Sequence, residues 1–137
     1  MYNHRLLVID DAIIHRKILC RVGEKAGFDT TEAGSFDEAA RLLHDKEFDC
    51  ITLDLSLGDR AGVEVLSLLS VNKCRVPIII ISGSEETIRE DSLKIGNSLN
   101  LNLCAPLSKP VDLSALRESL MRIAQQVGLR KLAGAPA

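Results

Sequence analysis

Five polar side chains of this sequence follow short apolar runs, and their types are suited to binding a metal ion. Three are carboxylates, one is a hydroxyl and one is an ammonium group: Asp10, Asp11, Asp54, Ser82 and Lys109. Carboxylates that lie close together repel one another and resist ionising at the same time. A hard divalent cation removes this conflict, and Mg²⁺ prefers oxygen ligands in octahedral geometry. If the fold brings these side chains together, they form a candidate Mg²⁺ site.

The same set predicts phosphoryl chemistry at Asp54. The cation would take Asp54, one carboxylate of the earlier pair and a backbone carbonyl, which we assign to Ser56. Its open positions would accept phosphoryl oxygens, so Asp54 could act as a nucleophile and form an aspartyl phosphate. Lys109 and the hydroxyl of Ser82 would hold the phosphoryl oxygens and offset their charge.

Apolar runs and segments of helical spacing alternate along the chain, and this alternation predicts the elements that position the five side chains. The expected strands are 6–9, 28–33, 50–53, 76–81 and a fifth within 99–107. The expected helices are 12–26, 35–46, 63–70, 85–96 and 112–127, with Ser35 and Asp112 as N-caps. The strand at 28–33 is more polar than the others, which indicates an edge of the sheet.

Five consecutive strand–helix units predict a parallel sheet with helices on both faces. Right-handed crossovers limit the topology, and for five strands the order 2-1-3-4-5 is the natural choice. The predicted fold class is therefore α/β, a flavodoxin-like three-layer (βα)5 fold with a parallel five-stranded sheet. Ligands of such sheets bind beyond the carboxyl ends of the strands, near strands one and three. The five side chains are expected to meet there.

The composition argues against several classes of protein. With 17 basic and 19 acidic residues the net charge is −2, which does not favour a nucleic-acid surface. No stretch approaches the roughly 20 apolar residues that a membrane span needs, and the N-terminus lacks a long apolar region. We therefore expect a cytoplasmic protein, with one domain at 1–129 and a flexible tail at 130–137.

The cysteines do not form a redox or zinc motif. They stand far apart in the sequence with apolar neighbours, at positions 20, 50, 74 and 104. We expect small buried thiols in a reducing compartment.

The residues at the strand ends resemble those of response-regulator receiver domains of two-component signalling, over residues 5–127. The motifs that carry the resemblance are Ile9-Asp10-Asp11, Asp54-Leu55, Ser82-Gly83 and Ser108-Lys109-Pro110. Each motif alone is weak, but all four occur in the family's order and at predicted strand ends.

The resemblance implies roles for individual residues. Mg²⁺ would bind Asp10 and Asp11, and Asp54 would be phosphorylated by a sensor histidine kinase or a histidine phosphotransfer protein. Ser82 and Lys109 would contact the phosphoryl group. Such a domain catalyses only its own phosphorylation and dephosphorylation, so we do not expect an enzyme.

The resemblance also implies how the signal would leave the domain. Phosphorylation would shift a two-state equilibrium and change the binding of a downstream protein. That protein would use the face formed by the helix at 85–96, the strand within 99–107 and the helix at 112–127. No direct contact with nucleic acid or membrane is expected. The Lys109–Pro110 peptide bond would be cis, an option nearly confined to proline.

The sequence departs from the family's pattern in three places. Gly58 stands where a proline is usual, although Gly62 matches the usual glycine. Pro106 stands where the family has a tyrosine or phenylalanine that moves on phosphorylation, so this readout is not expected. The segment from Ser82 to Lys109 is longer than is typical, and its residues 96–101 resemble receivers that precede EAL-type cyclic-di-GMP phosphodiesterases.

The sequence also leaves room for other functions and for further residues at the site. A Mg²⁺-dependent phosphohydrolase of the haloacid-dehalogenase type needs a second carboxylate two residues after the nucleophile, where this chain has Ser56. A nucleotide or flavin binder would need a glycine-rich phosphate loop, which is absent. The chain could also be the receiver fragment of a longer regulator. Ser56 and Ser84 could tune dephosphorylation, and His15 could overlook the site, although we expect a surface histidine.

Overall fold

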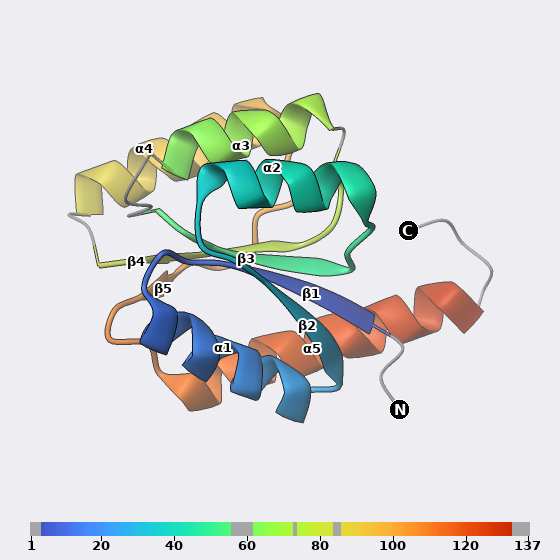
Figure 1. Ribbon diagram of the computed structural model, residues 1–137. Coiled ribbons are helices and arrows are strands. Elements are labelled where there is room, and N and C mark those ends of the chain that lie inside the picture. The colour runs from blue at the N-terminus through green and yellow to red at the C-terminus, as the bar shows by residue number, and fades with distance from the viewer. Residues whose placement is uncertain (1–3, 56–61, 73, 84–85, 133–137) are drawn as a thin grey trace.

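The computed structural model describes residues 4–55, 62–72, 74–83 and 86–132, and it forms a five-stranded parallel sheet between two layers of helices (Figure 1). The strands are β1 (His4–Ile9), β2 (Phe28–Ala33), β3 (Cys50–Asp54), β4 (Ile78–Ser82) and β5 (Leu107–Ser108). The helices are α1 (Ile13–Lys25), α2 (Phe36–Asp45), α3 (Gly62–Val71), α4 (Glu86–Ser98) and α5 (Leu113–Leu132). The strand order β2-β1-β3-β4-β5 confirms the predicted flavodoxin-like α/β fold.

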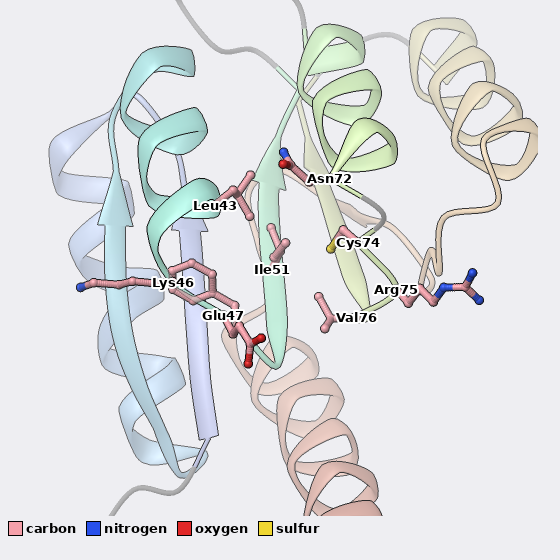
Figure 2. A pocket seen from close by; sticks show the side chains of 9 residues that line it. Leu43, Lys46, Glu47, Ile51, Asn72, Cys74, Arg75 and Val76 are labelled. Carbon is pink, nitrogen blue, oxygen red and sulfur yellow. The ribbon is translucent and has the colours of Figure 1, made fainter. Parts of the chain in front are cut away.

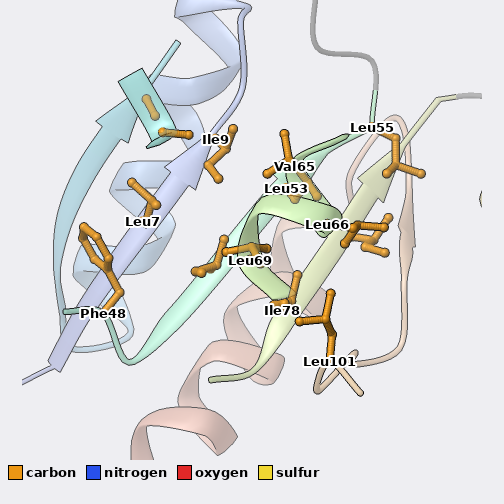
Figure 3. Packing of buried hydrophobic residues seen from close by; sticks show 14 residues of the cluster. Leu7, Ile9, Phe48, Leu53, Leu55, Val65, Leu66, Leu69, Ile78 and Leu101 are labelled. Carbon is orange, nitrogen blue, oxygen red and sulfur yellow. The ribbon is translucent and has the colours of Figure 1, made fainter. Parts of the chain in front are cut away.

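Each face of the sheet has its own apolar core, because side chains alternate between the faces of a strand. Leu7 and Ile9 of β1 point to the side covered by α2, α3 and α4, where they join the cluster of Figure 3. Leu6 and Val8 belong to the opposite cluster, under α1 and α5. The central strands β3 and β4 are buried along their whole length, as their continuous apolar runs predict.

The more polar β2 lies at the edge of the sheet, which confirms the prediction made from its composition. Both predicted N-caps are also confirmed. The hydroxyl of Ser35 accepts the backbone N–H of Glu38 at 3.2 Å, and Asp112 Oδ1 accepts that of Ser114 at 3.0 Å. These bonds satisfy N–H groups that a helix start leaves without a partner, which fixes where α2 and α5 begin.

The fifth strand, predicted to lie within 99–107, consists of Leu107 and Ser108 alone and so ends one residue beyond that range. The chain forms an isolated bridge between Leu103 and Ile78, and then pairs again only at Leu107 and Ser108. Between them Pro106 has no backbone N–H to donate, so it interrupts the ladder. The beginning of the predicted range, residues 99 and 100, forms the turn that follows α4, in which the N–H of Leu99 donates to the carbonyl of Ile95 at 3.0 Å.

The last helix is longer than predicted. It runs to Leu132 rather than to about Val127, and the ammonium of Lys131 lies 3.3 Å from a carboxylate oxygen of Asp49. The predicted end of the domain at 129 therefore lies within α5. Most of the expected tail, 133–137, falls outside the described residues. Among the helices that the structure describes, none has the length and apolar character to cross a membrane.

Alanine substitutions at two helical glycines should have opposite effects on stability. A Cβ on Gly23 of α1 would lie 2.6 Å from Leu6 Cδ2 and 3.0 Å from Thr30 Cγ2, whereas a Cβ on Gly128 of α5 would meet nothing closer than 3.9 Å. We expect Gly23→Ala to lower the free energy of unfolding by about 1–3 kcal/mol through overpacking. Gly128→Ala should raise it by about 0.5–1 kcal/mol, because alanine favours the helix. Urea unfolding measures both, and a stabilised Gly23→Ala would contradict the packing described here.

Candidate functional site

The parallel register of the sheet brings three predicted site residues to its carboxyl edge. Ile9 pairs with Leu53, and Asp54 pairs with Ile81, so β1, β3 and β4 end side by side. The residues at these ends are Asp10, Asp54 and Ser82, and their exposed fractions are 0%, 2% and 1%. Such burial is rare for carboxylates unless another group compensates their charge.

Lys109 provides one compensating charge. Its ammonium Nζ lies 2.7 Å from Asp54 Oδ2, and its backbone N–H donates to the carbonyl of Ser82 at 3.1 Å. The lysine stem crosses Gly83 closely, since a Cβ at that glycine would lie 3.3 Å from Lys109 Cδ. The Lys109–Pro110 peptide bond is cis, which confirms the expectation from the resemblance. The end of β5 therefore directs the ammonium group back over the end of β3.

His15 contributes to the site, contrary to the expectation of a surface histidine. Its side chain is only 25% exposed, and its Nδ1 contacts Asp10 Oδ2. Asp10 Oδ1 accepts the backbone N–H of Ala12 at 2.8 Å, which orients the carboxylate. Ligand atoms of Asp10, His15 and Asp54 all lie within 4.8 Å of one another. The signal in the sequence is the place of His15 near the start of α1, which follows the end of β1 after a short turn.

Of the remaining predicted site residues, the structure describes Asp11 alone. Asp11 is exposed, and within the described residues it is not part of the group formed by Asp10, His15 and Asp54. The predicted ligand Ser56 falls outside the described residues, as do Ser84 and Gly58. The catalytic and metal-binding roles of all these residues therefore stay predictions.

A network that sequence reasoning did not identify supports the edge of the site. Arg16 Nη1 donates to the carbonyl of Asp10 at 2.9 Å, and its Nε donates to Glu32 Oε1 at 2.8 Å. Lys17 Nζ donates to Glu32 Oε2 at 2.7 Å, and these hydrogen bonds from Lys17 and Arg16 lower the pKa of Glu32. A Cβ at Gly34 would lie 2.7 Å from Arg16 Nη1, so this guanidinium position needs glycine there. The end of β1 is thereby tied to β2.

The donor set of the site fits a divalent cation. It combines two buried carboxylates, from Asp10 and Asp54, with an imidazole nitrogen. Carboxylates suit Mg²⁺, Ca²⁺ and Mn²⁺, and imidazole suits several transition metals. Two carboxylates held this close repel each other, and a cation between them would add its positive charge to that of Lys109.

A cavity at the other end of the sheet lacks this chemistry. It has a volume of about 220 Å³ and lies near the amino ends of β3 and β4 (Figure 2). Its walls are formed by α2, the segment after it, β3 and residues between α3 and β4, including Leu43, Phe48, Ile51, Cys74 and Val76. Burial raises the pKa of the Cys74 thiol, which makes it a poor nucleophile.

The four cysteines behave as buried thiols. Cys20 and Cys50 are buried, Cys74 and Cys104 are half-buried, and all four are free. Burial raises the pKa of each thiol, most strongly at Cys50. The expectation of buried thiols is confirmed for Cys20 and Cys50, whereas Cys74 and Cys104 keep part of their surface exposed.

Comparisons with known proteins agree with the geometry. The family model of the response regulator receiver domain matches residues 6–121. The transcriptional regulatory protein SrrA of Staphylococcus aureus is 32% identical to this chain over 95 residues. The matched region covers 69% of this chain and 39% of SrrA, so the chain spans well under half the length of this curated relative.

Solved structures resemble the fold closely. The receiver domain of a Francisella response regulator has a TM-score of 0.77 at 24% identity, covering 91% of this chain and 99% of that one. A response regulator from Burkholderia pseudomallei, solved with a phosphorylated aspartic acid, a calcium ion and citrate, has a TM-score of 0.73 at 24% identity. The match covers 98% of this chain and 76% of that one. At this identity the likeness establishes the fold alone.

Two lysine–carboxylate pairs of equal length should differ in their contribution to stability. Lys109–Asp54 and Lys17–Glu32 both measure 2.7 Å, but Asp54 is buried whereas Lys17 is 60% exposed. In metal-free buffer we expect Lys109→Met to lower the free energy of unfolding by about 3 kcal/mol, because it removes the ammonium group that faces a buried carboxylate at 2.7 Å. Lys17→Met should cost at most about 1 kcal/mol. Equal losses on urea unfolding would contradict this assignment.

Proposed function

The chain belongs to the response regulator receiver domain family, and from this premise we propose that it accepts a phosphoryl group on Asp54 with the help of a divalent cation. One observation carries the proposal. The buried carboxylate of Asp54 is paired with Lys109 at 2.7 Å and has ligand atoms of Asp10 and His15 within 4.8 Å. The groups to which we assign the roles of nucleophile, cation ligands and phosphate-binding ammonium therefore lie together at one edge of the sheet.

We assign the chemical step to Asp54. A carboxylate oxygen of Asp54 forms a bond to phosphorus, while the bond from phosphorus to the donor's histidine nitrogen breaks and its electron pair stays on that nitrogen. Asp10 and Asp54 would hold Mg²⁺, with Asp11 and Ser56 as the further predicted ligands. The bound cation would offset the charge of the carboxylates and of the phosphoryl oxygens.

Lys109 and Ser82 would bind the phosphoryl group. The ammonium of Lys109 already contacts Asp54, so a phosphoryl group on that residue would meet it without a large movement. Ser82 ends the neighbouring strand, in register with Ser108. Both groups stabilise negative charge that develops during transfer, which is how most of the catalysis in phosphoryl transfer arises.

The proposed outcome is a change of partner binding. A sensor histidine kinase or a histidine phosphotransfer protein would supply the phosphoryl group, and the α4–β5–α5 face would bind a downstream partner. A phosphoryl group carries about 1.5–2 negative charges and replaces the single charge of the carboxylate, so phosphorylation adds at most about one negative charge and three acceptor oxygens to a buried site. We expect this change to shift an equilibrium between two loop arrangements. Because Pro106 has no aromatic ring to move inward, we place the readout in the contacts of Ser82 and Lys109 rather than in a side chain at 106.

The first test is phosphorylation by a small-molecule donor. After incubation with acetyl phosphate and Mg²⁺, intact mass should show one added phosphoryl group on the wild type and none on Asp54→Ala. Asp29→Ala, which removes an exposed carboxylate of β2, is the control and should label like the wild type. Unchanged labelling of Asp54→Ala would remove Asp54 from its role. Turnover of added phosphomonoesters would instead favour the phosphohydrolase.

The second test is stabilisation by the cation. Mg²⁺ at 100 times its dissociation constant should raise the free energy of unfolding by about 2.7 kcal/mol, because it binds only the folded chain. Asp10→Asn should lose most of this gain, since it removes a charged ligand, whereas Asp29→Asn should keep it. Urea unfolding with and without Mg²⁺ measures the difference. An equal gain in Asp10→Asn would place the cation elsewhere.

A further inference from the structure

We propose that His15 is a direct ligand of the cation, so that the site binds divalent transition-metal ions more tightly, relative to Mg²⁺, than a site made only of oxygen ligands. This inference rests on the proposed function, because it concerns the cation that assists phosphorylation of Asp54. It adds a nitrogen ligand, from near the start of α1, to the carboxylates at the ends of β1 and β3.

The geometry around His15 supports coordination. Its Nδ1 contacts Asp10 Oδ2, so the nitrogen is aimed at the carboxylate rather than at solvent. Ligand atoms of Asp10, His15 and Asp54 lie within 4.8 Å of one another. Ligands of one octahedral cation lie about 3 Å apart when adjacent and about 4 Å apart when opposite, for metal–ligand distances of about 2.1 Å. Small side-chain adjustments would therefore bring all three onto one ion.

The position of Asp11 strengthens the case. Two adjacent carboxylates follow β1, but only Asp10 is buried with Asp54, while Asp11 is exposed. Within the described residues, the third ligand atom of the group comes from His15 and not from Asp11. His15 is also partly exposed, at 25% of its side chain, so a cation can reach it from solvent.

The choice of ligand changes the choice of metal. Mg²⁺ is a hard cation that prefers oxygen ligands, whereas imidazole is a good ligand for later first-row metals such as Co²⁺, Ni²⁺ and Zn²⁺. A nitrogen ligand therefore adds more to the binding of Co²⁺ than to the binding of Mg²⁺. Removing the imidazole should therefore lower the affinity for Co²⁺ more than the affinity for Mg²⁺. A residue that only orients Asp10 would lower both affinities equally when it is replaced.

The decisive measurement is spectroscopic. Mn²⁺ bound to the wild type should give nitrogen modulation in pulsed electron paramagnetic resonance, which reports a coordinated imidazole. The modulation should vanish in His15→Gln and persist in His44→Gln, which replaces a histidine whose side chain is 82% exposed. Absence of the modulation from the wild type, or its persistence in His15→Gln, would overturn the inference.

Calorimetry gives an independent measure. We expect His15→Gln to lower the affinity for Co²⁺ relative to Mg²⁺ by at least about tenfold, the smallest effect usual for groups that support a bound metal. His44→Gln should leave the ratio as in the wild type. Equal loss of both affinities in His15→Gln would mean that the residue only positions Asp10, and would overturn the inference. Failure of the wild type to take a phosphoryl group from acetyl phosphate defeats the proposed function, whereas labelling without nitrogen coordination defeats only this inference.

Discussion

Two carboxylates are buried side by side in this structure, and the need to compensate their negative charge determines which groups surround them. Asp10 and Asp54 are almost inaccessible to solvent, and each lies at the end of a buried strand. Buried charges of one sign are tolerated only when opposite charge or hydrogen bonds compensate them. Lys109 supplies charge to Asp54, the N–H of Ala12 donates a hydrogen bond to Asp10, and Nδ1 of His15 contacts the other oxygen of that carboxylate. The elements that follow β1 and β5 deliver these groups.

The remaining fold supplies the rigidity that this arrangement needs. Two apolar clusters hold the sheet from both faces, so the ends of β1, β3 and β4 have fixed positions. The stem of Lys109 needs a glycine beside it, since a side chain at Gly83 would crowd it. The site thus combines the ends of packed strands with side chains from the segments that follow β1 and β5.

Much of the site could be predicted from the sequence because its residues stand at the ends of apolar runs. Parallel strands place their carboxyl ends together, so Asp10, Asp54, Ser82 and Lys109 follow from pattern and topology. The limits of β5 could not be predicted, because they depend on where α4 ends and on the ladder that Pro106 interrupts. Helical spacing placed His15 near the site, but its contact with Asp10 depends on how α1 packs against the sheet. The length of α5 likewise reflects contacts beyond its own pattern.

Hydrogen bonds of Arg16 connect the edge strand β2 to the acidic pocket. One guanidinium group bonds both the backbone of Asp10 and the side chain of Glu32 on β2. An edge strand with a polar surface is the part of a sheet that opens most readily, and amide hydrogen exchange detects such opening. Because Arg16 links β2 to the end of β1, we expect ordering of the pocket to slow exchange in β2 as well. The state of the acidic pocket can therefore be followed at amides of the sheet's edge, in a strand that supplies no ligand to it.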